Sequence, residues 1–163
     1  NARGAIARFD RSALEIRLVD CQECPRADVA IAQLLFSTAR ALCEERWSTS
    51  LAQRALDTRQ LRGLLDEVAR TGENTILTDR EFLALFGRES LSGAPAGRLW
   101  RSLADEVMPD GPLRPTIDHI LDRGTLATRI LRRTESRFSR RHLHRVYAEL
   151  ADCLRDGRLL DEA

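Results

Sequence analysis

The chain has 163 residues, of which 43% are hydrophobic and 31% charged, a composition typical of a folded globular protein and not of a disordered one. Its 26 basic and 25 acidic residues leave a net charge of +1, which gives no general reason to expect nucleic acid or an anionic membrane as a partner. Apart from three His, every basic residue is Arg, so mechanisms that need a Schiff-base or phosphate-binding lysine are excluded.

The start of the chain and its cysteine content indicate whether the sequence is part of a longer protein and in which cellular compartment it lies. The chain begins at Asn1 rather than at Met, so we expect it to be cut from a longer protein. No apolar run approaches the roughly 18 residues of a membrane span, and no signal peptide is recognisable. Four cysteines (Cys21, Cys24, Cys43 and Cys153) are too few for a disulfide framework in a domain of this size. We therefore expect a cytoplasmic protein.

The first twenty residues predict a β-hairpin. Residues 5–9 are short and largely apolar, residues 10–12 are typical of a turn, and residues 13–19 alternate between apolar and polar side chains. An isolated hairpin is only marginally stable in water, so we expect this one to belong to a larger sheet.

Helical patterns follow from residue 25 onward. Pro25 suits the first turn of a helix, Asp57-Thr58 predicts a restart within the second helical stretch, and Gly72 predicts a helix end. Further short helices are expected through residue 134, and a last helix after Ser139 that ends at Gly157. The predicted fold class is α+β and predominantly helical, with an N-terminal antiparallel hairpin (1–20) followed by about six to eight helices (25–163).

Glu15 and Arg17 are the main candidates for chemistry. They project from one face of a predicted strand, two residues apart, so their side chains leave the backbone about 7 Å apart. They can neutralise each other on a solvated face, or they can converge on a ligand, because a carboxylate suits Mg²⁺ and Arg binds phosphate or carboxylate oxygens. The spacing alone favours the solvated face.

The residues around this pair resemble the late active-site strand of the glutamate–cysteine ligase family. The strand is followed by a Pro-initiated apolar helix, and its pattern of Glu, hydrophobic, Arg, two variable residues and Asp is complete. The preceding residues resemble the type 2 carboxylate–amine ligase branch, and residues 120–127 agree more loosely. The strongest resemblance covers roughly the first 45 residues, and its core is Ala13-Leu14-Glu15-Ile16-Arg17-Leu18-Val19-Asp20.

That resemblance implies a role for each matching residue. Glu15 would ligate Mg²⁺, and Arg17 would bind the γ-phosphoryl group of ATP and the acyl phosphate, as the catalytic and cofactor-binding residue. Asp20 and Arg8 would contact substrate, and Arg3 is a further candidate for binding an anion. The family implies a glutamine-synthetase-like antiparallel sheet, amino-acid substrates, and ATP and Mg²⁺ as cofactors.

The early strands of such a ligase, with its other metal-binding carboxylates, are missing from this sequence. One carboxylate does not hold Mg²⁺ usefully, because affinity needs several converging ligands. We therefore expect residues 1–163 to be the C-terminal part of a single ligase domain, inactive on its own. The sequence does not name the amine substrate.

Two alternatives stay open. One is a helical interaction or oligomerisation domain whose hairpin pairs with another chain, so that a homo-oligomer would form. The other is a dithiol redox protein that uses Cys21-Gln22-Glu23-Cys24, although no βαβ pattern surrounds that motif. The arginines around residues 132–141 form a basic cluster that we interpret as a solvated face, because few aromatic residues lie among them.

Overall fold

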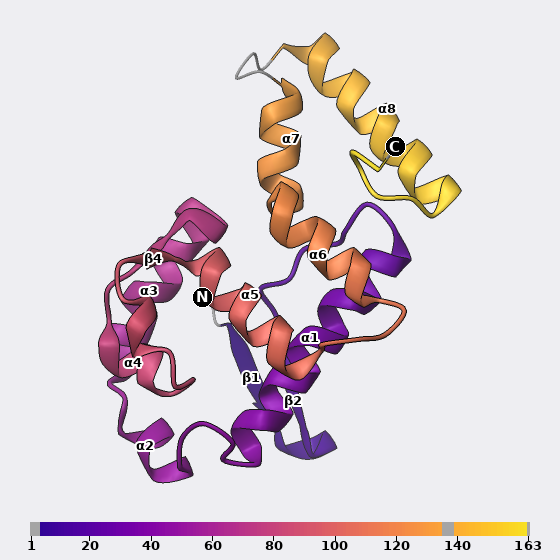
Figure 1. Ribbon diagram of the computed structural model, residues 1–163. Coiled ribbons are helices and arrows are strands. Elements are labelled where there is room, and N and C mark those ends of the chain that lie inside the picture. Colours follow the sequence, from indigo (N-terminus) through magenta and orange to yellow (C-terminus); the bar gives the residue numbers. More distant parts are fainter. Residues whose placement is uncertain (1–3, 135–138, 163) are drawn as a thin grey trace.

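The computed structural model describes residues 4–134 and 139–162 and confirms the predicted fold class (Figure 1). A small antiparallel hairpin opens the chain, and eight α-helices lie in the described residues. The strands are β1 (Ala5–Arg8), β2 (Ala13–Ile16), β3 (Ile76–Leu77) and β4 (Ala94–Pro95). The helices are α1 (Pro25–Cys43), α2 (Ser50–Ala55), α3 (Thr58–Thr71), α4 (Arg80–Ala84), α5 (Ala96–Val107), α6 (Arg114–Arg123), α7 (Leu126–Thr134) and α8 (Arg140–Asp156).

Local capping signals place most of the helix ends. Pro25 is the first residue of α1, where the N–H that it lacks would have had no partner. The side chain of Asp57 accepts a hydrogen bond from the Arg59 N–H and starts α3, as the predicted restart requires. Ser139 caps α8, which ends at Gly157 in a left-handed conformation. Helix boundaries are therefore the part of the fold that is encoded most locally.

The structure differs from the sequence prediction at the end of the second strand. That strand ends at Ile16 rather than near residue 19, and the Arg17 N–H that follows it donates to the Gly4 carbonyl at 2.9 Å. Residues 88–97 contain β4, which pairs with β3. Helix α4 is capped by Asp79, which accepts from the Phe82 N–H at 3.0 Å.

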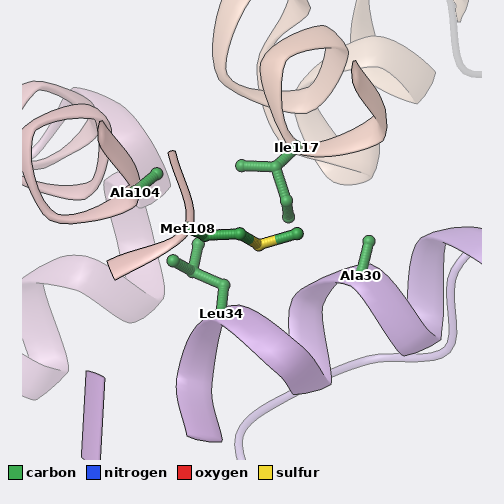
Figure 2. Packing of buried hydrophobic residues seen from close by; sticks show 5 residues of the cluster. All are labelled: Ala30, Leu34, Ala104, Met108 and Ile117. Carbon is green, nitrogen blue, oxygen red and sulfur yellow. The ribbon is translucent and has the colours of Figure 1, made fainter. Parts of the chain in front are cut away.

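Two apolar clusters hold the helical body together. In the first, α1 packs against α5 and α6, and Met108 fills the space between them (Figure 2). The second lies where β3, α4 and α5 meet, and Leu83 at its centre is fully buried. The members of the first cluster are Ala30, Leu34, Ala104, Met108 and Ile117, and those of the second are Leu77, Leu83, Ala96, Leu99 and Leu103. Burial of these side chains supplies the main driving force for folding.

Helices α7 and α8 form an arm that extends from the rest of the helical body (Figure 1). The chain after α8 turns back, and Leu159 and Leu160 are buried there. Leu159 packs with Cys24 and Ala27 at the start of α1, so the C-terminal segment contacts the beginning of the helical region. None of the helices in the described ranges is long and apolar enough to cross a membrane.

Candidate functional site

Strand register places a second arginine beside the Glu15–Arg17 pair. Ile6 lies opposite Glu15 and Arg8 lies opposite Ala13, so Arg8 is a diagonal neighbour of Glu15 on the same face of the hairpin. Arg17 follows β2 directly and projects from this face as well. The face therefore carries a carboxylate between two guanidinium groups.

Each oxygen of Glu15 accepts a hydrogen bond from a different arginine. Nη1 of Arg8 donates to Oε2 at 2.9 Å, and Nε of Arg17 donates to Oε1 at 2.8 Å. Hydrogen bonds from Arg8 and then Arg17 lower the pKa of the Glu15 carboxyl below its ordinary value. Hydrogen bonds to Asp10 and to Glu15 raise the pKa of Arg8. Glu15 is therefore ionised at neutral pH and orients both arginines.

Acidification should release this arrangement below the pH at which a free glutamate titrates. The charged form of Glu15 is favoured in the folded chain, so the interaction is complete above the unfolded pKa and is lost as the pH falls through the lowered, folded pKa. An NMR pH titration of the Glu15 carboxyl carbon measures this directly. Arg17→Gln should move the pKa back toward its ordinary value, and Arg11→Gln should not, because Arg11 pairs with Asp10. An equal shift in both variants would contradict the assignment.

The predicted role of Glu15 as a Mg²⁺ ligand depends on the groups that surround its carboxylate. Both Glu15 oxygens already accept an N–H, and two positive charges lie beside them. Among the described residues, no group of three or more His, Cys, Asp or Glu side chains could hold a metal ion. Mg²⁺ needs several oxygen ligands around it. The described residues by themselves do not make up a Mg²⁺ site, so that role requires further ligands from outside them.

Asp20, a further predicted site residue, does not join the hydrogen bonds around Glu15. Asp20 is exposed in the segment between β2 and α1, where its carbonyl accepts from Nε2 of Gln22 at 2.8 Å. It lies outside the hydrogen-bonded network of Arg8, Glu15 and Arg17 and lines a groove with Leu18. Arg3 lies outside the described residues. Of the four predicted site residues that the structure describes, the hairpin therefore brings three together and leaves Asp20 apart.

The two faces of the hairpin have an unusual burial pattern. The side chains of Arg8 and Glu15 are about one-third exposed and that of Arg17 is 50% exposed, whereas Leu14 and Ile16 on the opposite face are 61% and 44% exposed. An ordinary two-faced strand shows the reverse arrangement, with its apolar side chains covered. The polar face is therefore partly covered at Arg8 and Glu15 and open to solvent at Arg17.

The two cysteines of the Cys21–Cys24 motif differ in their exposure to solvent. Cys21 is exposed, Cys24 is fully buried at the N-cap of α1, and both are free thiols. Cys153 is also fully buried, and burial raises the pKa of its thiol. The raised pKa opposes the thiolate form at Cys153, which lies outside the Cys21–Cys24 motif.

One charged pair was not predicted from the sequence. Glu23 and Arg129 are buried together, with Nη1 of Arg129 2.5 Å from Oε1 of Glu23. The same carboxylate oxygen accepts from the Leu160 N–H at 3.1 Å, and Nε of Arg129 donates to the Gly124 carbonyl at 3.1 Å. Since 106 residues separate the pair in the chain, no local pattern could have indicated it. It joins the segment before α1 to the start of α7 and to the C-terminal segment.

Comparison with known proteins gives one short similarity. A protein of Archaeoglobus fulgidus, described only as an uncharacterized protein, is 47% identical to this chain over 45 residues. Those residues are 28% of this chain and 12% of that protein, so the match spans a small part of the relative's length. No family model matches the chain, and no solved structure matches it.

Proposed function

We propose that this chain is the C-terminal part of an ATP- and Mg²⁺-dependent carboxylate–amine ligase similar to the glutamate–cysteine ligases. The observation that carries the proposal is the fixed arrangement of Arg8 and Arg17 on opposite oxygens of Glu15. Two oriented guanidinium groups on one sheet face suit an anion with several oxygens, such as a transferring phosphoryl group. The resemblance over residues 13–20 supports the same function.

Arg17 is the proposed catalytic residue. It uses Nε for Glu15, and within the described residues its two Nη atoms make no hydrogen bond. Their N–H groups are therefore available to bind phosphoryl oxygens. In the proposed reaction a substrate carboxylate attacks the γ-phosphorus of ATP, an acyl phosphate forms and ADP leaves. An amine then attacks the acyl carbon, the C–N bond forms, and phosphate leaves as the nitrogen loses a proton.

The charge on the reacting groups explains why arginines suit this site. The acyl phosphate and the departing ADP both carry negative charge, so fixed positive charge stabilises the transition state more than the separated reactants. Glu15 is a positioning residue in this scheme, because it holds Arg17 and Arg8 in place. Mg²⁺, when held by further ligands, would supply additional charge neutralisation. The contact of Asp20 with substrate remains part of the proposal.

The acyl phosphate provides a direct chemical test. The protein that carries this chain is incubated with ATP, Mg²⁺, glutamate and hydroxylamine, which attacks activated carboxyl groups. We expect an ATP-dependent hydroxamate, measured as its coloured ferric complex. ATP turnover without hydroxamate, at a hydroxylamine concentration that traps synthetic acyl phosphates, would contradict the proposed intermediate.

A second candidate function is an interaction or oligomerisation domain. The exposure of Leu14 and Ile16, together with Phe9 at 91%, favours it, because apolar surface of this kind is common where another chain binds. Sedimentation equilibrium of the 163-residue chain separates monomer from oligomer. A monomer at every concentration would count against this function, and an oligomer that Leu14→Ser dissociates would support it.

A further inference from the structure

Exposed apolar side chains gather along one groove between the arm and the body. The groove has a volume of about 1020 Å³ and is bordered by residues 18–23 and by parts of α1, α3, α7 and α8. Five large apolar residues that line it are between 43% and 59% exposed: Leu18, Val19, Leu131, Tyr147 and Leu154. A concentration of apolar surface in one concave region indicates a binding site.

A smaller pocket of about 470 Å³ continues from this groove. The two cavities share lining residues from the end of α3 and the start of α7, including Gly72 and Thr125. The lining of the smaller pocket is different in kind, since it contains Arg70, Arg132 and Asn74 and, within the described residues, no acidic side chain. One continuous surface therefore has a long apolar part and a basic end.

The two arginines of this pocket have no counter-charge within the described residues. Nε of Arg70 donates to the Asp66 carbonyl at 3.1 Å, and Nη1 of Arg132 donates to the Arg123 carbonyl at 2.5 Å. Neither lies within ion-pair distance of a carboxylate in the described part of the chain, although most described arginines do. Both arginines are exposed and line the same pocket, so an anion bound there would be attracted by two positive charges.

Two carboxylates close to Arg70 in the sequence, Asp66 and Glu73, are engaged by other groups. Glu73 accepts a hydrogen bond from the Thr125 hydroxyl at 2.9 Å and does not line the pocket. Asp66 pairs with Arg62 at 3.0 Å. Within the described residues, neither of these carboxylates serves as the counter-charge of Arg70 or Arg132.

We propose that this surface binds a single-chain anionic amphiphile, an acyl chain that ends in a carboxylate. The acyl chain lies in the apolar groove, and the carboxylate lies between Arg70 and Arg132. Burial of the chain against Leu131, Tyr147 and Leu154 supplies affinity, and the two guanidinium groups select the negative end. Asp20, which the proposed ligase assigns to its substrate, borders the apolar groove, whereas the basic end of the site uses none of the residues assigned to the ligase. The binding tests below use neither ATP nor an amine, so their outcome does not depend on that function.

Calorimetric titration of the 163-residue chain tests the site with three probes. Dodecanoate, below its micellar concentration, should bind more tightly than butyrate, which has the charge without the chain. It should also bind more tightly than dodecyltrimethylammonium, which has the chain with the opposite charge. Equal binding of dodecanoate and butyrate, or of dodecanoate and the cation, would overturn the proposal.

Matched charge variants test the role of the two arginines. Arg70→Gln/Arg132→Gln should weaken dodecanoate binding by about tenfold, because charge-assisted hydrogen bonds are lost. Arg59→Gln/Arg98→Gln removes the same charge from exposed arginines outside both cavities and should change the affinity less than twofold. Equal affinities in the two double variants would overturn the site. A concentration-dependent dimer that does not bind dodecanoate would show that a second copy covers the groove, and would also overturn it.

Discussion

Arg129→Met should destabilise the folded chain by about 3–5 kcal/mol, because it leaves the charge of Glu23 buried without a partner. Both side chains of the pair are completely shielded from solvent. Arg129 also donates to the carbonyls of Gly124 and Leu160, so the substitution removes hydrogen bonds from two further segments. A loss of this size is a large share of the roughly 5–15 kcal/mol that stabilises a typical domain.

A double variant separates the charge from the packing. In Glu23→Gln/Arg129→Met neither charge is left unpaired, so part of the lost stability should return relative to Arg129→Met alone. Chemical unfolding followed by circular dichroism measures both free energies. As a control, Arg155→Met removes an arginine whose ion pairs are exposed and should change the free energy of unfolding far less than Arg129→Met does. A cost for Arg129→Met no greater than that of the control would contradict this account of the buried pair.

Gly124→Ala should have the second large effect on stability. Gly124 has φ +94° and ψ 169° between α6 and α7, a backbone conformation that is essentially restricted to glycine. A Cβ there would lie 2.7 Å from Oε1 of Glu73 and 3.1 Å from Cγ2 of Thr128, so strain and steric conflict add together. We expect a loss of about 3–5 kcal/mol in the free energy of unfolding.

Two other glycines provide matched controls for that substitution. Gly157 has φ +67° with nothing within 4 Å of an added Cβ, so Gly157→Ala should cost only the left-handed strain of about 1–2 kcal/mol. Gly63 lies within α3 with open space around it, so Gly63→Ala should raise stability by about 1 kcal/mol. Equal losses for Gly124→Ala and Gly157→Ala would show that contact with Glu73 contributes nothing.

The sequence correctly predicted those parts of the structure that depend on residues close to one another in the chain. Pro25, Asp57, Ser139 and Gly157 mark helix ends because the groups that they cap or terminate lie within a few residues of them. The hairpin followed in the same way from a turn between two short strands. The short β3–β4 pairing was missed, because two residues per strand give no alternation to detect.

Contacts between distant segments could not be predicted in this way. Glu23 lies inside the Cys21–Cys24 motif, which was interpreted from its two cysteines alone. Its partner Arg129 lies in α7, 106 residues further along the chain. The position of Arg8 beside Glu15 depends on strand register, which the turn determines. The exposure of Leu14 and Ile16 depends on what covers each face of the hairpin, which a strand pattern does not record.

Coupled ADP release by the protein that carries this chain tests the proposed ligase most directly. With ATP, Mg²⁺, glutamate and a panel of amines, we expect release that depends on both glutamate and an amine. Arg17→Ala should lower the rate about 100-fold or more, because it removes the guanidinium that we propose to face the transferring phosphoryl group. Arg11→Ala, which removes an exposed arginine of the same hairpin, should leave the rate unchanged. Undiminished turnover in Arg17→Ala would contradict the assignment.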